Sequence, residues 1–147
     1  MSRTVIKKFK ELSGTEMYEL LKLRQDVFVL EQDCLYPDID DLDQESIHLL
    51  MYETDKLIAY GRVLWNEEQD LPCVGRVVVD PGVRGKSHGK TLMLALNDLA
   101  RQLYPGQTIY AMAQEYLERF YTELGYEREG DSFLEDDIPH IHMYLKA

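Results

Sequence analysis

The sequence predicts one α+β domain spanning residues 1–147, with a mixed sheet flanked by helices. The length of 147 residues is typical of one domain. Strand-like and helical segments follow one another in the order βα–βββ–α–β–α–ββ, and a sheet covered by helices is the usual way to bury such faces. No repeat, low-complexity tract or long linker divides the sequence.

The N-terminal half begins with a strand at 4–9 and a helix at 16–29, where apolar residues recur with helical period on one face. Residues 31–45 follow, with seven carboxylates, one proline and neither lysine nor arginine, which predicts a loop. Acidic runs of this kind are usually solvated. Two strands, 47–52 and 57–65, are joined by a polar turn.

The C-terminal half continues this alternation. A valine-rich strand at 71–79 stops at Asp80-Pro81-Gly82, and a basic, glycine-bearing loop precedes a helix that ends near residue 104. The remaining segments are a strand at 108–113, a short helix at 115–124, and two last strands at 126–133 and 141–145.

Charge and composition exclude several classes of partner. Sixteen basic against 27 acidic residues give a net charge of −11, which repels nucleic acids and anionic membranes. No apolar run approaches the roughly 20 residues of a membrane helix, and the N-terminus becomes polar too soon for a signal peptide. Cys34 and Cys73 lie far apart without metal-ligand spacing, so we expect free, buried thiols in a cytoplasmic protein.

The strongest local signal is the loop from Val83 to Thr91, between a strand and a helix. Arg84, Lys86 and Lys90 lie near unpaired amides at the helix start, a combination that binds phosphate groups. Two alternatives remain. Ser87 could cap the helix without any ligand. The loop also resembles a Walker A motif, although its glycines are separated by three residues instead of four.

The residues of this loop resemble a known family. Arg84-Gly85-x-x-x-Gly89 after a valine-rich strand is similar to the acetyl-CoA turn of the GNAT N-acetyltransferases. Motifs from about residue 16 to residue 143 resemble the ElaA-like branch of this family. They are Leu21-x-Leu23-Arg24-x-x-Val27-Phe28-Val29-x-Glu31-Gln32, Tyr36-x-Asp38-x-Asp40, His48-Leu49-Leu50, Gly75-Arg76-Val77-Val78-Val79, Ala113-Gln114-x-x-Leu117-x-x-Phe120-Tyr121 and Glu135-Asp136-x-Ile138-Pro139-His140-x-x-Met143.

Three positions depart from the family pattern. Ser87 stands where the turn usually has its middle glycine, and we expect the loop to survive. Asp41 and Asp137 replace glycines that are common in the branch, and each can alter a turn.

The resemblance implies a GNAT-like domain with a mixed, mostly antiparallel sheet of about seven strands and about four helices. It implies transfer of an acetyl group from acetyl-CoA to a primary amine of a small molecule or amino acid, by direct attack in a ternary complex. The alternative is a catalytically silent CoA-binding regulatory domain. The resemblance also allows a homodimer.

The resemblance also implies a set of cofactor-binding residues. Backbone groups of the turn, together with Arg84, would hold the CoA diphosphate. The backbone of Val77, Val78 and Val79 would pair with the pantetheine and polarise the thioester oxygen, if this strand splays from its neighbour, although three valines alone indicate only a buried strand. The complete set is Val77, Val78, Val79, Arg84, Gly85, Lys86, Ser87, His88, Gly89, Lys90 and Gln114.

For catalysis, Tyr121 matches the family's general acid. A tyrosine, with a pKa of about 10, can protonate a leaving thiolate whose pKa is about 8.5. The alternative is a packing aromatic beside Phe120.

The group that accepts the proton of the acceptor ammonium stays open among four residues, acting directly or through water. Each also has a structural interpretation; His48, for example, can be a satisfied strand histidine. The four are Glu31, His48, Glu135 and His140.

Arg24, Glu31 and His140 are expected to bind the acceptor, although Arg24 can instead pair with an internal acid. No metal is expected. His140 and His142 with Asp136 would be a sparse ligand set for one.

Overall fold

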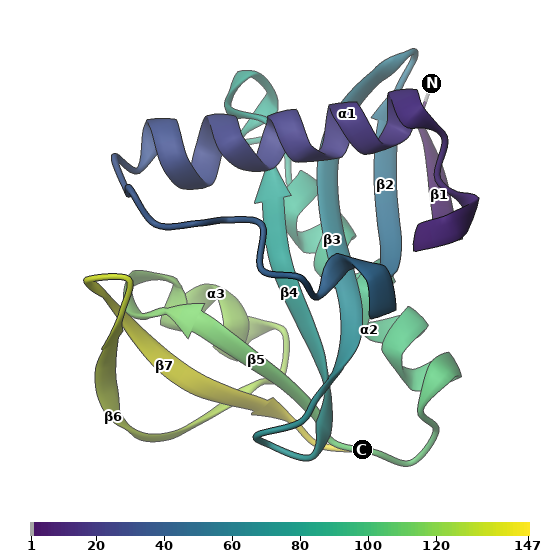
Figure 1. The fold of residues 1–147 in the computed structure, drawn as a ribbon. Coiled ribbons are helices and arrows are strands. Elements are labelled where there is room, and N and C mark those ends of the chain that lie inside the picture. The colour runs from purple at the N-terminus through teal and green to yellow at the C-terminus, as the bar shows by residue number, and fades with distance from the viewer. Residues whose placement is uncertain (1) are drawn as a thin grey trace.

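The structure, a computed structural model that describes residues 2–147, is built on a seven-stranded sheet with helices on both faces (Figure 1). Neighbouring strands are antiparallel except β4 and β5, which are parallel. This confirms the mixed, mostly antiparallel sheet. In their spatial order the strands are β1 (Ser2–Lys8), β2 (Ile47–Glu53), β3 (Lys56–Asn66), β4 (Leu71–Val79), β5 (Ile109–Gln114), β7 (Ile138–Leu145) and β6 (Glu127–Glu135).

Three α-helices lie in residues 2–147, one fewer than the four expected. The loop expected up to residue 45 is confirmed for residues 32–45, where several acidic side chains turn inward to arginines and only a short 3₁₀ turn forms. The α-helices are α1 (Gly14–Arg24), α2 (His88–Leu103) and α3 (Glu118–Glu123). A π-helical segment, η2 (Gln25–Glu31), continues α1, and 3₁₀ turns form at η1 (Phe9–Glu11), η3 (Asp43–Glu45), η4 (Pro81–Val83) and η5 (Glu115–Leu117).

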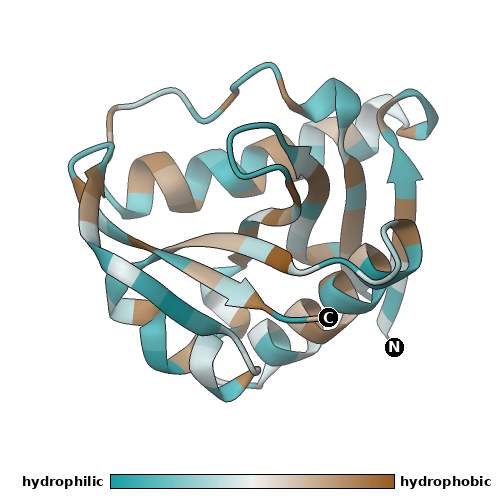
Figure 2. Cartoon of the chain, turned by 90° about the horizontal axis from the view of Figure 1, so that it is seen from below, coloured by the Kyte–Doolittle hydropathy of each residue, from teal (hydrophilic) through white to brown (hydrophobic). Residues whose placement is uncertain are grey.

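Two hydrophobic clusters lie on opposite faces of the sheet. α1 packs on one face through Leu20 and Leu23, while α2 packs on the other through Leu92 and Leu96. In Figure 2 the apolar colouring gathers along the central strands, and the outer turns are mostly hydrophilic. Gly61 on β3 lies directly beneath α2. A Cβ at this position would overlap the side chain of Leu96.

β4 and β5 meet at one end of the sheet and separate toward the other, as Figure 1 shows. Within residues 2–147 they share a single residue pair, Cys73 with Tyr110, and β4 then runs on to Val79 without β5. A β-bulge shifts the register of β4 against β3 between Tyr60 and Arg62, which bends the strand further. The separation exposes one edge of β4 in the middle of the molecule.

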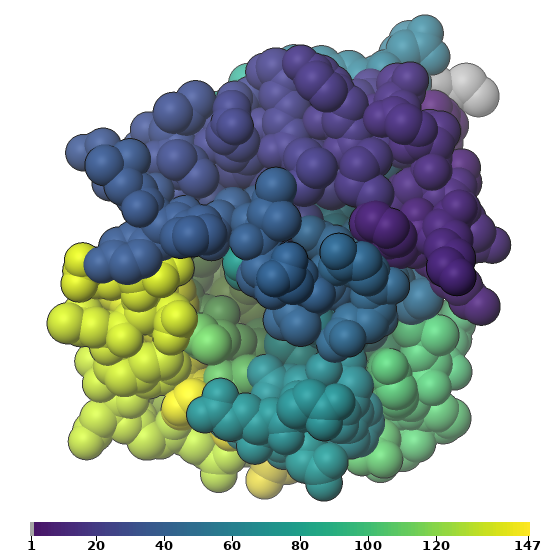
Figure 3. All heavy atoms as spheres, in the orientation of Figure 1, coloured from purple at the N-terminus to yellow at the C-terminus, as the bar shows by residue number. Residues whose placement is uncertain are grey.

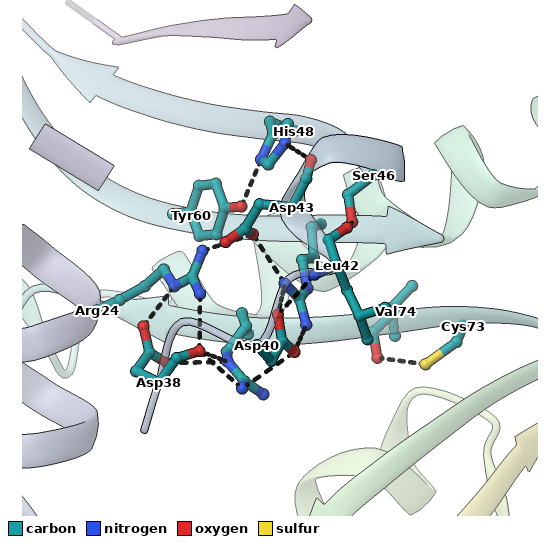
Figure 4. A network of polar contacts seen from close by, with 12 residues as sticks. Arg24, Asp38, Asp40, Leu42, Asp43, Ser46, His48, Tyr60, Cys73 and Val74 are labelled. Atoms are coloured by element: carbon teal, nitrogen blue, oxygen red, sulfur yellow. Dashed lines mark hydrogen bonds and ion pairs between the residues drawn. The ribbon is translucent and has the colours of Figure 1, made fainter. Parts of the chain in front are cut away.

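The acidic strap, residues 31–45, crosses the front of the sheet instead of projecting into solvent. In Figure 3 it rests on the turn between β6 and β7 above a hollow. The usual interpretation of an acidic run, a solvated face, is therefore wrong for part of this one. Three strap carboxylates pair with three arginines from α1, β3 and β4 (Figure 4): Asp38 with Arg24 and Arg76, Asp40 with Arg62 and Arg76, and Asp43 with Arg24 and Arg62.

These ion pairs keep the strap acids charged. Burial alone would raise the pKa of Asp40, but the hydrogen bonds and charge of Arg62, with the charge of Arg76, outweigh it and lower the pKa to about 2. Asp43 shows the same balance, because Arg24 and Arg62 lower its pKa against the opposing effect of burial. Each buried arginine thus pairs with at least one carboxylate that stays ionised at neutral pH, Asp43 for Arg24 and both Asp40 and Asp43 for Arg62.

The three departures from the family's glycines fall where the backbone is left-handed. Ser87, Asp41 and Asp137 have φ angles of 62°, 66° and 61°. Aspartate tolerates this conformation better than most side chains, because its short polar group can bond locally. The turns therefore persist without glycine, and the expectation that the loop at Ser87 survives is met.

The helices of residues 2–147 include none that is both long and apolar enough to cross a membrane. Cys34 and Cys73 are both free, but only Cys73 is buried; Cys34 is half-buried, so the expectation of two buried thiols is only partly correct.

We predict that acid weakens the fold through Asp40. Its folded pKa of about 2 lies below the ordinary 3.8, so the unfolded chain binds more protons between these values. The contribution of about 2 kcal/mol is complete above about pH 4 and is lost as the pH falls toward 2. Urea unfolding at pH 7, 4 and 3 measures it.

The Asp40→Asn variant is the control, because it lacks the titrating group. Its stability should be lower at pH 7 and should fall less steeply below pH 4. An equal decline in both proteins would contradict the assignment.

Candidate active site

A cavity of about 1030 Å³ opens where β4 and β5 separate. It lies between the strap and η2 on one side and α2, α3 and β5 on the other, and it reaches the turn between β6 and β7. Of the expected site residues, those lining it are Glu31, Val77, Val78, Val79, Arg84, Gly85, Ser87, His88, Gly89, Lys90, Gln114, Tyr121 and His140.

The turn before α2 has the geometry of an anion site. Gly85 and Ser87 both have left-handed backbones, with φ of 85° and 62°, and α2 begins directly afterwards. The Ser87 side chain forms no capping hydrogen bond, so the capping alternative is wrong. The first amides of α2 therefore remain available to a ligand. Arg84 and Lys90 line the cavity beside them, whereas Lys86 is exposed and lies outside its walls.

Arg84 is already paired. Its two terminal nitrogens donate to the two carboxylate oxygens of Glu31, each at 2.7 Å, so the end of η2 is joined to the anion turn. The hydrogen bond from Arg84 lowers the pKa of Glu31. A carboxylate held in this way is a poor proton acceptor. Glu31 instead binds the Arg84 guanidinium, which the resemblance expects to bind the diphosphate.

The valine strand presents an unpaired edge to the cavity. Val78 and Val79 pair with Tyr60 and Ala59 of β3 on one side, and no strand within residues 2–147 pairs with them on the other. The separation that the resemblance required after this strand is thus present. Backbone groups on this edge can hydrogen-bond an extended ligand in the way a neighbouring strand would.

Tyr121 on α3 both packs and faces the cavity. Its side chain is 6% exposed and lies edge-to-face against Phe120 and Tyr126, each at 5.4 Å between ring centroids. Burial raises the pKa of its hydroxyl. Because this hydroxyl forms no hydrogen bond with another residue of the described chain, it is free to donate to a ligand.

His140 on β7 lines the cavity with one nitrogen fixed. Nδ1 donates to the carbonyl of Ile138 at 2.7 Å, which leaves Nε2 as the nitrogen with a lone pair. Nε2 makes no hydrogen bond within residues 2–147. In a neutral ring this hydrogen bond selects the tautomer in which Nε2 can accept a proton.

Besides Lys86 and Glu135, two expected site residues lie outside the cavity. His48 is fully buried outside the cavity; its Nε2 donates to the Asp43 carbonyl at 2.9 Å, and its Nδ1 accepts from Tyr60 at 2.6 Å. Burial lowers its pKa. Arg24 is also fully buried and bonds Asp38 and Asp43 instead of lining the cavity. The structure therefore corrects both assignments to structural roles, and for Arg24 it supports the internal-acid alternative.

The strap closes one side of the cavity through three contacts with the β5–β7 side. Tyr36 donates to Asp137 at 2.6 Å, the Cys34 thiol lies 3.8 Å from the Asp136 carbonyl, and Gln114 donates to Gln32 at 3.2 Å. Gln114 thus ties the strap to the cavity wall.

Sequence reasoning missed the role of Arg76. Its guanidinium lies at the cavity wall and binds Asp38 and Asp40. Two features of the sequence could have indicated it. The acidic run at 31–45 has no lysine or arginine of its own, and two predicted strands each contain an arginine, Arg62 and Arg76. These features suggest internal pairing, but they cannot assign the partners.

No group of three or more histidine, cysteine, aspartate or glutamate side chains able to hold a metal ion occurs in residues 2–147. His142, a candidate metal ligand in the sequence, instead has its Nδ1 2.6 Å from the hydroxyl of Tyr110.

This fold and cavity match a known class. The model of the acetyltransferase (GNAT) domain family matches residues 14–147, so the chain belongs to that family. Within it, the resemblance to the ElaA-like branch is confirmed. Protein ElaA of Escherichia coli is 40% identical over 136 residues, which cover 90% of this chain and 89% of ElaA. Its crystal structure superposes with a TM-score of 0.92, covering 99% of this chain and all of the other.

Two further relatives agree. A UPF0039 protein of Schizosaccharomyces pombe is 39% identical over 144 residues, which cover 97% of this chain and 95% of that protein. The crystal structure of an acyl-CoA N-acyltransferase from Pseudomonas aeruginosa has a TM-score of 0.91 at 35% identity and covers 98% of this chain and 99% of that one.

We predict that Glu31→Gln strengthens acetyl-CoA binding. The substitution frees Arg84 and removes a negative charge next to the turn, so the Kd measured by calorimetry should fall about 3- to 10-fold. The gain should shrink at high salt. Glu45→Gln, the same charge change on an exposed strap residue outside the cavity, is the control. Unchanged or weaker binding by the Glu31 variant would contradict competition for Arg84.

Proposed function

We propose that this protein is an acetyl-CoA-dependent N-acetyltransferase that acetylates a primary amine of a small molecule or amino acid. The observation that carries the proposal is one cavity lined by the turn before α2, the unpaired edge of β4 and Tyr121. The turn suits a phosphate group, the strand edge suits an extended amide chain, and the tyrosine suits a leaving thiolate.

The residues fit acetyl-CoA, which supplies the acyl group as a thioester. The amides at the start of α2, with Arg84 and Lys90, suit a diphosphate. Gly85 and Ser87 of this turn both have left-handed backbones and line the cavity. The edge of β4 from Val77 to Val79 suits the amides of a pantetheine arm, and a backbone N–H here can stabilise charge on the thioester oxygen.

The reaction proposed for these groups is direct attack. The amine nitrogen bonds to the thioester carbon, the carbon–sulfur bond breaks, and Tyr121 donates its proton to the thiolate. The raised pKa of Tyr121 keeps the hydroxyl protonated until the sulfur leaves.

His140 is proposed to accept the ammonium proton, directly or through water, since its Nδ1 is fixed and its Nε2 is unbonded. Glu31 and His48 are engaged elsewhere. Glu135 is exposed and lies outside the cavity walls.

A small acceptor suits the shape of the site. The strap bridges from the α1 side to the β6–β7 turn, so a polypeptide segment would have to pass beneath it. The acidic net charge favours a cationic amine over nucleic acid or an anionic membrane. The free thiols suit a cytoplasmic location. A homodimer stays a prediction.

A panel assay tests the function. Purified protein with acetyl-CoA should release free thiol with at least one amine or amino acid, and acetyl-CoA, not ATP, should raise its Tm. Binding without thiol release across amines, amino acids and peptides would favour the silent CoA-binding domain. Stabilisation by ATP alone would favour the Walker-type alternative.

We predict that Tyr121→Phe lowers kcat about 100-fold, because the thiolate loses its proton donor. The Kd of acetyl-CoA should change by less than about twofold, since packing against Phe120 and Tyr126 is kept. Tyr126→Phe is the matched control: that hydroxyl donates to Asn97 away from the cavity, so its loss should lower Tm and spare kcat. Equal kcat values for both variants would exclude Tyr121 as the acid.

A further inference from the structure

Arg76 has an unusual backbone for its place in the fold. Its φ angle is 50°, in the left-handed region. Among the non-glycine residues with positive φ in residues 2–147, it alone lies inside a strand, while the others lie in turns and loops. A residue with a Cβ holds this conformation only where its surroundings impose it.

The surroundings of the Arg76 side chain can impose it. Its Nε lies 2.9 Å from the Asp38 carboxylate, and its Nη2 donates to the Asp38 carbonyl at 2.9 Å. Nη2 also lies 3.3 Å from the carboxylate of Asp40. Figure 4 labels both strap acids and shows Asp38 beside Arg24.

Asp38 and Asp40 are each held by a second arginine. Asp38 accepts a hydrogen bond from the fully buried Arg24 at 2.8 Å, and Asp40 accepts one from Arg62 at 3.0 Å. The Arg76 guanidinium therefore binds a rigid partner, not a mobile surface acid, and its side chain can hold the backbone to which it is attached.

The left-handed residue sits in the β4 bulge. Val78 pairs with Tyr60, and Gly75 pairs with Arg62, so Arg76 and Val77 together oppose the single residue Gly61. A bulge of this kind bends its strand and interrupts the ladder. Here the bend follows the residue pair with β5 at Cys73, and the backbone from Val77 to Val79 lines the cavity.

We propose that Arg76 is a positioning residue: clamped by Asp38 and Asp40, it holds the β4 bulge and thereby directs the Val77–Val79 backbone toward the thioester. This inference rests on the proposed function for its kinetic consequence. Its structural half, that the clamp maintains the bulge, stands independently. The competing role is direct contact, because the Arg76 side chain is 30% exposed and lines the cavity.

Arg76→Ala and Arg76→Gly separate these roles. Both remove the clamp and the charge. Alanine retains a Cβ that disfavours the left-handed backbone, whereas glycine adopts it freely. If Arg76 positions the strand, the alanine variant should lose about 10- to 100-fold in kcat, and the glycine variant should be at least about fivefold faster than alanine. If Arg76 binds a ligand, both variants should lose equally, chiefly in KM, which would overturn the proposal.

A crystal structure of each variant provides the readout independent of activity. Arg76→Ala should move residue 76 to negative φ and flatten the bulge, while Arg76→Gly should keep it. A bulge unchanged in the alanine variant would overturn the proposal whether or not the protein acetylates amines. A wild-type protein that fails to bind acetyl-CoA would instead refute only the proposed function.

Asp40→Asn covers the case in which the alanine variant does not fold. It weakens the clamp and leaves Arg76 in place, so kcat should fall about two- to fivefold with little change in KM. Wild-type kcat in this variant, with Tm lowered, would show that the ion pairs stabilise the fold without positioning the strand.

Discussion

The single residue pair between β4 and β5 is the constraint on which the site depends. If these parallel strands were paired along their whole length, the sheet would be continuous and their backbone N–H and C=O groups would hydrogen-bond each other. Because pairing stops at Cys73 and Tyr110, the edge of β4 from Val77 to Val79 faces a cavity instead. The same separation places the start of α2 and the face of α3 on the walls of that cavity, so one break in a ladder brings together a turn, a strand edge and a tyrosine.

A second arrangement keeps this break in place. An open strand edge would tend to collapse onto its neighbour or collect water. Here the acidic strap crosses in front of β4 and is fixed by ion pairs to Arg24 of α1, Arg62 of β3 and Arg76 of β4. Compared with well-packed apolar residues, buried charge pairs of this kind add little net stability, because desolvation offsets attraction, but they are directional. They specify where the strap lies and which conformation the bulge takes.

The sequence predicted the strands, the helices and the glycine-bearing turn before α2 well, because hydrophobic period and glycine are local signals. It could not assign the buried ion pairs, since residues far apart along the chain meet only through the tertiary fold. It could not decide between His48 and His140 either: both lie on strands, and which face a strand residue occupies depends on register with its neighbours. The left-handed backbone of Arg76 could not be predicted either, because a valine-rich segment predicts a regular strand.

The proposed function requires a CoA diphosphate to bind at the turn before α2. A crystal structure of the complex with acetyl-CoA tests this most directly. We expect the diphosphate within hydrogen-bonding distance of the amides between residues 85 and 90, Arg84 turned from Glu31 toward it, and the pantetheine amides bonded to the β4 edge. A diphosphate bound elsewhere on the molecule, or a pantetheine arm that leaves this edge uncovered, would contradict the account.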